Sequence, residues 1–283
     1  MNGDRVRVVA GIAPTDYRLP MVLWAAGEAV VRDAELLLVC AVPAYSAPEQ
    51  YLPVEAADAR RKAGLAHLAD AAEQARAAYP GLLVTTDVAA GAPADVLRRA
   101  AADAALVVVG ADDQSPFAEA ITGSVPGALL TTLSCPLAVV PPAEPSGDAA
   151  APVVVALDDT GSSHSALAYA FAAADQARRA LVVLHCLPPG KNEAAGPKLT
   201  LTAFRELYSR VEVTEEVAAG DPKDILAQRS RRAALLVLGS RGHGRLSSVV
   251  FGSVGRDLIR RSGCPVVVAR PSAGEVDGSP ARR

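Results

Sequence analysis

Closely spaced glycines in the last third of the chain could bind a phosphate group. The segment 239–254 contains Gly239, Gly242 and Gly244, and a Gly-Ser pair follows at 252–253, where a helix is expected to begin. Glycine lets backbone N–H groups approach a ligand closely, and such groups bind anions together with a helix N-terminus. We interpret this loop as a phosphate cradle; the alternative is that its glycines only shape a surface loop.

A carboxylate marks a second segment where chemistry is possible. Asp158 directly follows the apolar run VVVAL at 153–157, and a carboxylate there can accept a hydrogen bond from a nucleobase amino group or a ribose hydroxyl. Thr160 can reach a phosphate, although it can equally cap the next helix, as can Asp159 and Ser162. Asp158 is the stronger functional candidate, because the end of a strand faces the expected pocket.

Both segments follow strands of one predicted sheet. Apolar runs alternate with helical patterns from 153 to 270, which favours a doubly wound parallel sheet flanked by helices. The expected strands are 153–157, 180–187, 211–217, 234–239 and 265–270, and the expected helices are 162–177, 199–210, 222–231 and 253–261. Asp221 and Pro222 suit the N-cap and first position of a helix. Ligands of such sheets bind beyond the carboxyl ends of the strands, which is where both candidate segments begin.

The chain contains this unit twice. Residues 88–110 align with 217–239 at an offset of 129, and twelve of these 23 positions are identical. Further upstream, residues 8–26 align with 153–171 at an offset of 145. The difference of 16 residues predicts an insertion between about 45 and 87 in the first copy.

Composition and charge exclude several classes of protein. Hydrophobic residues make up 51% of the 283 residues, and the net charge is -3, which argues against a general nucleic-acid binder. No apolar stretch is long enough to predict a membrane span. The four cysteines form no C-x-x-C pair, so we expect free thiols and a cytoplasmic location.

Common catalytic signatures are also missing from the sequence. There is no G-x4-G-K-[ST] spacing and no G-x-S-x-G elbow, which argues against a P-loop NTPase and an α/β-hydrolase. His185 lies within an expected strand beside Cys186, and we interpret it as a core residue rather than a metal ligand. Arg241 and Arg245 are the basic residues best placed to meet phosphates in the glycine loop.

Taken together, these motifs resemble a tandem member of the universal stress protein family. The family signature G-x2-G-x9-G-[ST] matches Gly239, Gly242, Gly252 and Ser253. The family pattern V-x-V-D-G-S at the first strand matches 155–160, with Asp in place of the usual Gly and Thr in place of Ser. The resemblance covers nearly the whole chain.

This resemblance implies two tandem Rossmann-like domains, each an open five-stranded parallel sheet flanked by helices. We expect domains at 1–142 and 152–271, followed by a disordered tail at 272–283. It also implies an ATP site in the second domain, with Mg²⁺ as the default companion of the triphosphate. Asp158 would contact adenine. The residues expected to line the base are Ala156, Leu157, Cys186 and Leu238, and those expected around ribose and phosphates are Thr160, Gly239, Gly242, Gly252, Ser253 and Val254.

The first copy departs from the family pattern on two sides of its pocket. Asp113 replaces the middle glycine, and Ala13 stands where the second copy has Asp158. Asp112 and Glu119 add negative charge where phosphates would lie. We predict that this domain binds ATP poorly or not at all. Its acidic loop is either a solvated surface or, less simply, a metal site.

Three functions remain open at this point. The first is a regulatory protein that binds an adenine nucleotide in its second domain and recognises an unidentified protein partner. The second is an enzyme acting on adenine nucleotides, at most a slow ATPase, and the third is an interaction protein with neither pocket filled. The resemblance also implies that 136–140 pairs with 265–270, so the two copies form an intramolecular pseudo-dimer, and a further homodimer is possible.

Overall fold

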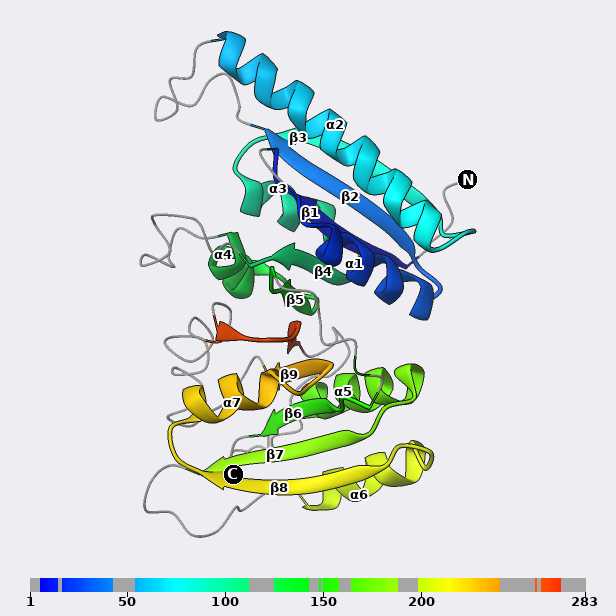
Figure 1. Ribbon diagram of the computed structural model, residues 1–283, viewed down its shortest axis with the longest axis vertical. Coiled ribbons are helices and arrows are strands. Elements are labelled where there is room, and N and C mark those ends of the chain that lie inside the picture. Colours follow the sequence, from blue (N-terminus) through cyan, green and yellow to red (C-terminus); the bar gives the residue numbers. More distant parts are fainter. Residues whose placement is uncertain are drawn as a thin grey trace, which may run out of the picture.

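The computed structural model shows strands and helices alternating through both halves of the chain (Figure 1). It describes residues 6–14, 17–42, 54–111, 125–142, 148, 150–157, 164–187, 198–239, 258 and 261–270. The predicted tail at 272–283 lies outside these residues. So does most of the expected helix 253–261, of which Leu258 and Arg261 are helical.

The described residues of the N-terminal domain form five strands and four helices. They are β1 (Arg7–Ile12), α1 (Leu19–Val31), β2 (Glu35–Val42), α2 (Val54–Ala78), β3 (Val84–Ala90), α3 (Pro93–Ala100), β4 (Ala104–Gly110), α4 (Val125–Thr132) and β5 (Leu137–Val140).

The C-terminal domain repeats this order. Its elements are β6 (Val153–Leu157), α5 (His164–Ala177), β7 (Leu181–Leu187), α6 (Lys198–Leu207), β8 (Val213–Ala219), α7 (Pro222–Ser230), β9 (Leu235–Gly239) and β10 (Val266–Ala269). Most elements agree with the predicted ranges to within one or two residues. The predicted N-cap is confirmed, because the Asp221 carboxylate accepts a hydrogen bond of 2.9 Å from the Lys223 backbone N–H.

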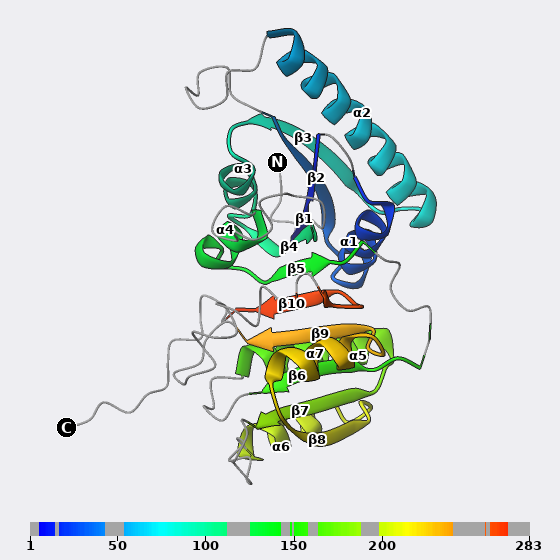
Figure 2. The same cartoon turned by 60° about the vertical axis from the view of Figure 1, so that its left-hand side comes forward.

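All ten strands join into one sheet with the order β3-β2-β1-β4-β5-β10-β9-β6-β7-β8. Strands within each domain are parallel, which confirms the predicted fold class. The expected pairing of the last strands is also present: β5 and β10 lie side by side and antiparallel, with Val139 opposite Val266 (Figure 2). The two domains therefore share one continuous sheet.

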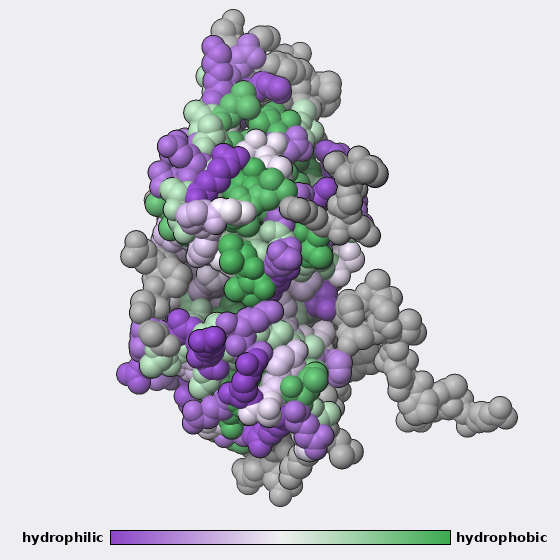
Figure 3. All heavy atoms as spheres, turned by 90° about the vertical axis from the view of Figure 1, so that its right-hand side faces the viewer, coloured by the Kyte–Doolittle hydropathy of each residue, from purple (hydrophilic) through white to green (hydrophobic). Residues whose placement is uncertain are grey.

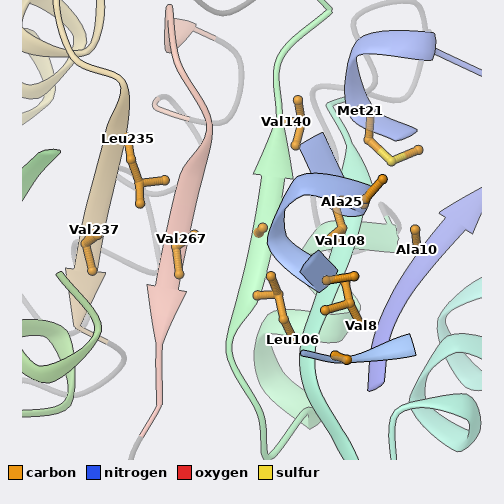
Figure 4. Packing of buried hydrophobic residues seen from close by; sticks show 14 of the residues in the cluster. Val8, Ala10, Met21, Ala25, Leu106, Val108, Val140, Leu235, Val237 and Val267 are labelled. Atoms are coloured by element: carbon orange, nitrogen blue, oxygen red, sulfur yellow. The ribbon is translucent and has the colours of Figure 1, made fainter. Parts of the chain in front are cut away.

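Helices cover the sheet on both faces. Buried side chains of α1, α2, α5 and α6 pack on one face in a single cluster that spans both domains, and Figure 4 shows part of it, from Val8 to Val267. On the other face, α3 and α4 cover the N-terminal domain and α7 covers the C-terminal domain. The central strands are apolar on both faces because both faces are covered.

Polar contacts between helices also join the domains. Arg32, which follows α1, donates a hydrogen bond of 2.8 Å to the hydroxyl of Tyr169 on α5. Glu28 accepts from Arg32 and from Tyr169. Burial raises the pKa of Tyr169 above its ordinary range, and Glu28 adds to the effect, so the phenol stays a neutral donor. A second contact between the domains is made by Arg270, which follows β10 and donates a hydrogen bond to the carbonyl of Leu130 on α4.

The two domains differ most in their second helices. Helix α2 has 25 residues and α6 has ten, so the predicted insertion includes the extension of α2. None of the helices in the described ranges combines the length and apolar character that a membrane span needs.

Candidate functional site

The candidate site lies at the carboxyl ends of β6, β7 and β9. Strand β6 pairs with β7 on one side and with β9 on the other. The chain leaves β6 toward α5 on one face of the sheet, whereas Leu258, a helical residue described after β9, packs on the opposite face. Strand connections that diverge in this way open a crevice at the carboxyl edge, where ligands of α/β sheets bind.

Three of the predicted base-lining residues share one face of the sheet. Ala156 on β6, Cys186 on β7 and Leu238 on β9 belong to the cluster under α7, and Ala156 stands opposite Leu238 in the strand register. Cys186 and Leu238 are buried, while Ala156 is partly exposed. The structure therefore brings these three side chains together in one apolar cluster at the strand ends, in which Ala156 is the partly exposed member.

Leu157, the fourth predicted lining residue, points to the opposite face. It packs in the cluster that contains α5 and α6, because successive side chains of a strand alternate between faces. Its side chain therefore does not share the surface formed by Ala156, Cys186 and Leu238. His185 also faces this side and is only 7% exposed, which agrees with its interpretation as a core residue.

The side chain of Cys186 is a neutral thiol rather than a reactive thiolate. Burial raises its pKa to about 12, although the positive charge of Arg229 lowers it somewhat. A thiol with this pKa stays protonated at neutral pH, and a protonated thiol behaves as a small apolar group. It can pack against an aromatic ring but offers no anion for covalent chemistry.

Other predicted site residues lie outside the described residues. Gly239 is described: it ends β9, is partly exposed and pairs with Ala269 of β10. Those that the structure does not describe are Asp158, Thr160, Arg241, Gly242, Gly252, Ser253 and Val254, and Asp112, Asp113 and Glu119 of the first copy. The chain enters the segments of Asp158 and Gly242 from the adjacent strands β6 and β9.

Helix α7 contributes a residue to this cluster that the strand patterns did not predict. Leu226 of α7 is buried in the same cluster as Cys186 and Leu238. The internal repeat could have indicated Leu226, because the matching position of the first copy is also a leucine, Leu97. Identical apolar residues on the equivalent helix of both copies indicate a residue that packs on the strand ends.

The matching edge of the N-terminal domain is closely packed by its own side chains. Gly11 stands where the C-terminal domain has Ala156, and a methyl group added to Gly11 would lie only 2.9 Å from Cδ1 of Leu97. On the other face, a methyl group on Gly64 of α2 would lie 2.8 Å from the sulfur of Cys40 and 3.6 Å from Cβ of Pro14. Glycine thus allows α2 to approach the strand ends.

Comparison with known proteins agrees with this architecture. Two tandem matches to the universal stress protein family cover residues 5–141 and 151–270. The universal stress protein Rv2623 of Mycobacterium tuberculosis is 30% identical, over 94% of this chain and 96% of that protein. Universal stress protein Rv2005c of the same organism is 29% identical, over 88% of this chain and 92% of its own length.

Solved structures share the fold at lower identity. A universal stress protein from Archaeoglobus fulgidus superposes with a TM-score of 0.74 at 21% identity, covering 95% of this chain and 97% of that one. A putative universal stress protein from Pseudomonas aeruginosa gives a TM-score of 0.58 at 17% identity, covering 94% of each chain. With both halves matched and the relatives covered over nearly their full length, the chain belongs to the universal stress protein family.

Proposed function

We propose that the C-terminal domain binds ATP at the carboxyl ends of β6, β7 and β9 and that the nucleotide has a regulatory role. The observation that supports this proposal is that Ala156, Cys186 and Leu238 share one face of the sheet at the ends of three neighbouring strands. Small and apolar side chains suit the flat face of a purine, and pockets for such ligands are mostly apolar with few polar groups.

Polar recognition is assigned to the segments that leave this edge. Asp158 follows β6 and would accept a hydrogen bond from the adenine amino group. The glycine loop begins at Gly239 and contains the full G-x2-G-x9-G-S spacing, which would supply backbone N–H groups to the phosphates. Arg241 would add positive charge there, and Mg²⁺ would accompany the triphosphate, whose oxygens are its usual ligands.

The N-terminal domain lacks the features that support this assignment. Its first strand is followed by the exposed Ala13 rather than by a carboxylate. On the other face of the sheet, Gly64 lets α2 lie close to Cys40 and Pro14 at the strand ends. We therefore propose one nucleotide per chain.

Titration calorimetry of the full chain, stripped of ligand, with ATP and Mg²⁺ tests the proposal. We expect one site per chain. Asp158→Ala and Ser253→Ala should each weaken binding by about tenfold or more, since a hydrogen bond to a charged group contributes about 1.5–3 kcal/mol.

A matched control comes from the repeat. Ser124 occupies the position of Ser253 in the first copy, and Ser124→Ala should leave the affinity unchanged. A flat titration of folded protein would overturn the proposal, and two equivalent sites per chain would overturn its restriction to one domain. Product formation from ATP that disappears in Asp158→Ala would instead establish an enzyme.

A further inference from the structure

Strand β3 forms one outer edge of the sheet, and β8 forms the other. Among the described strands, β3 pairs only with β2, in parallel register. The N–H of Leu36 donates to the carbonyl of Leu83 at 2.9 Å, and the N–H of Gly91 donates to the carbonyl of Val42 at 2.9 Å. Because the backbone groups of successive residues point to opposite sides of a strand, the odd-numbered residues from Leu83 to Gly91 direct theirs toward β2.

The even-numbered residues of β3 therefore direct their N–H and C=O groups to the open side of the strand. A contact with α2 confirms this direction, because the Arg76 guanidinium donates a hydrogen bond of 2.8 Å to the carbonyl of Val84. Further along the strand, Thr86 is exposed and Val88 is partly exposed. An outer strand whose backbone groups point outward in this way can accept an additional strand.

Helix α2 places further side chains beside this edge. Arg76 reaches the edge from one flank of α2, and Leu65 and Lys62 lie about three and four turns earlier on the same flank, at 3.6 residues per turn. Leu65 is 48% exposed, and Lys62 and Arg76 are exposed as well. The other flank of α2 faces α1, since its Asp70 accepts a hydrogen bond from the hydroxyl of Tyr17. We call Lys62, Leu65 and Arg76 the edge flank.

The edge flank carries a positive charge near each end of β3. Lys62 and Arg76 are about 21 Å apart at 1.5 Å per residue, which is about the length of the seven-residue strand β3. None of the ion pairs among the described residues involves Lys62 or Arg76. An extended segment with a carboxylate near each end and apolar residues between them would complement this flank.

Two acidic residues lie close by but on other surfaces. Val88 packs in the cluster that contains α2, so the side chain of its neighbour Asp87 points to the opposite face of the sheet. Glu73 lies on the solvent side of α2, nearly opposite the buried Ala75 around the helix. Neither carboxylate therefore lies between the edge flank and the open side of β3.

The other outer strand is protected by its own charges. Glu215 of β8 stands where β3 has Thr86, and it forms an ion pair of 3.0 Å with Arg205 of α6, the residue that matches Arg76. Charged residues on an outer strand hinder the addition of another strand. The fold therefore accepts a charged edge at this position, and the uncharged Thr86 leaves the arginine of α2 able to meet a carboxylate of another molecule.

The starts of the two outer strands differ in the same sense. Leu83 directly precedes β3 and is 44% exposed, whereas its match before β8 is Glu212. Figure 3 shows hydrophobic residues gathered over the N-terminal half of one side of the molecule, while the C-terminal half is mostly hydrophilic. Exposed apolar groups that gather on one surface mark interaction sites.

We propose that β3 binds an extended, acidic segment of another protein, which adds to the sheet as an additional strand. Its backbone hydrogen-bonds to the outward groups of Thr86 and Val88. Its side chains on the α2 side are acidic near both ends and apolar between them, and they face the edge flank. Main-chain pairing gives such complexes affinity, and alternate side chains give them specificity. The surface belongs to the N-terminal domain, so the proposal does not depend on nucleotide binding.

A synthetic peptide with the sequence Glu-Thr-Val-Thr-Val-Thr-Glu tests this proposal. In an extended peptide, the glutamates and valines share one face and the threonines share the other. We expect fluorescence anisotropy of the labelled peptide to show saturable binding to the full chain. A peptide with lysines in place of both glutamates should bind at least about tenfold more weakly. If the glutamate peptide shows no saturable binding, the proposal is overturned.

Methylation of single peptide nitrogens separates strand addition from charge attraction alone. Successive N–H groups of an extended peptide point to opposite sides. Of two peptides methylated at adjacent central nitrogens, one loses a donor that faces β3 and the other loses a donor that faces solvent. We expect the first to bind about fivefold or more weakly, because a hydrogen bond is lost, and the second to bind like the parent peptide. Equal affinities overturn the proposed pairing.

The two matched arginines provide a variant and its control. Arg76→Glu should weaken binding of the glutamate peptide by about tenfold or more and strengthen binding of the lysine peptide, because the charge beside β3 is reversed. Arg205→Glu makes the same change beside β8 and should leave both affinities unchanged. Thermal unfolding should show both variants folded. An equal loss of affinity in the two variants would exclude β3 as the specific site.

Amide hydrogen exchange identifies what occupies the edge. In the chain alone, the N–H groups of Thr86 and Val88 should exchange faster than those of Thr85 and Asp87, which face β2. The glutamate peptide should slow exchange at Thr86 and Val88. If these two amides are already protected without peptide, a second copy or another segment of this chain covers the edge, and the proposal is overturned.

Discussion

The two domains repeat the same backbone contacts and differ in the side chains placed on them. Gly91 donates to the carbonyl of Val42 at 2.9 Å, and Gly220 donates to that of Leu187 at 3.0 Å, at equivalent positions. Yet α2 lies close to the carboxyl edge of the N-terminal domain at Gly64, while the C-terminal domain has the candidate nucleotide site at its matching edge. The apolar runs of the strands are enough to give both domains the same backbone fold. The side chains at the strand ends can therefore differ between the two domains.

The layer between helices and sheet also differs. In the C-terminal domain, Phe171 of α5 stacks on Phe204 of α6 with ring centroids 5.3 Å apart. The equivalent residues of the N-terminal domain are Ala26 and Ala75, both fully buried. Large rings fill this space in one domain, and close helix packing fills it in the other.

The largest effect on stability is expected when one of these packed rings is removed. Phe171→Ala removes a fully buried ring, and we expect the free energy of unfolding to fall by about 3–5 kcal/mol. Denaturant unfolding of the full chain measures it. The reciprocal change, Ala26→Phe, should cost about 1–3 kcal/mol by overpacking. If Ala26→Phe were neutral, the N-terminal domain would not be packed as closely as its alanines indicate.

Alkaline pH should separate a second matched pair, Cys135 and Cys264. Burial raises the pKa of Cys264 from 9.0 to about 12. Burial also raises the pKa of Cys135, but a backbone hydrogen bond and, to a smaller extent, the charge of Arg270 oppose the shift. A folded protein that holds these protons more tightly than the unfolded chain keeps the full contribution below about pH 9 and loses it as the pH rises toward 12.

We therefore expect stability to fall across this range of pH and Cys264→Ala to flatten the fall more than Cys135→Ala does. Urea unfolding between pH 8 and pH 11 or so would measure the slopes. Equal slopes in the two variants would contradict the larger rise of the Cys264 pKa.

The apolar patterns of the strands made most of this fold predictable. They were less informative about where a strand begins and about which face of the sheet a side chain lies on. The continuous run 153–157 gave both ends of β6, but the alternating segment predicted at 211–217 is β8 at Val213–Ala219. The alternating pattern of residues is not confined to the strand, so it does not show where β8 begins. The strand begins at Val213 because this residue pairs with Leu181 of β7. The same alternation could have shown that Leu157 faces away from Ala156. The exposure of apolar residues such as Val30 and Leu83 could be seen only in the structure, because the sequence does not show whether an apolar residue is buried.

Nucleotide affinity offers a third comparison between the copies. Ala156→Val adds bulk to the proposed base-binding surface, and we expect ATP to bind about tenfold more weakly, since small-to-large changes in packed sites cost about 1–3 kcal/mol. Gly11→Ala makes the matching change in the first copy, where Leu97 must move, and should leave ATP affinity unchanged. Titration calorimetry of both variants measures the two affinities. An equal loss of affinity in Gly11→Ala would contradict the assignment of the nucleotide to the C-terminal domain.

The smallest effect concerns the start of the third helix of each domain, where the two copies differ in one capping group. Asp221 caps α7 through the Lys223 N–H, whereas Ala92 at the start of α3 makes no side-chain cap, although a proline follows in both. Asp221→Ala should therefore lower the free energy of unfolding by about 1 kcal/mol.

Ala92→Asp should recover up to about the same amount in the other domain, because Ala92 already has the extended backbone that a cap needs, with φ -64° and ψ 134°. Thermal unfolding of the two single variants and of the double variant measures both changes. Because the two caps lie in different domains and share no partner, the effects should add, so the double variant should be close to the unchanged protein. Destabilisation by Ala92→Asp would show that equivalent backbones at these two helices do not provide equivalent capping sites.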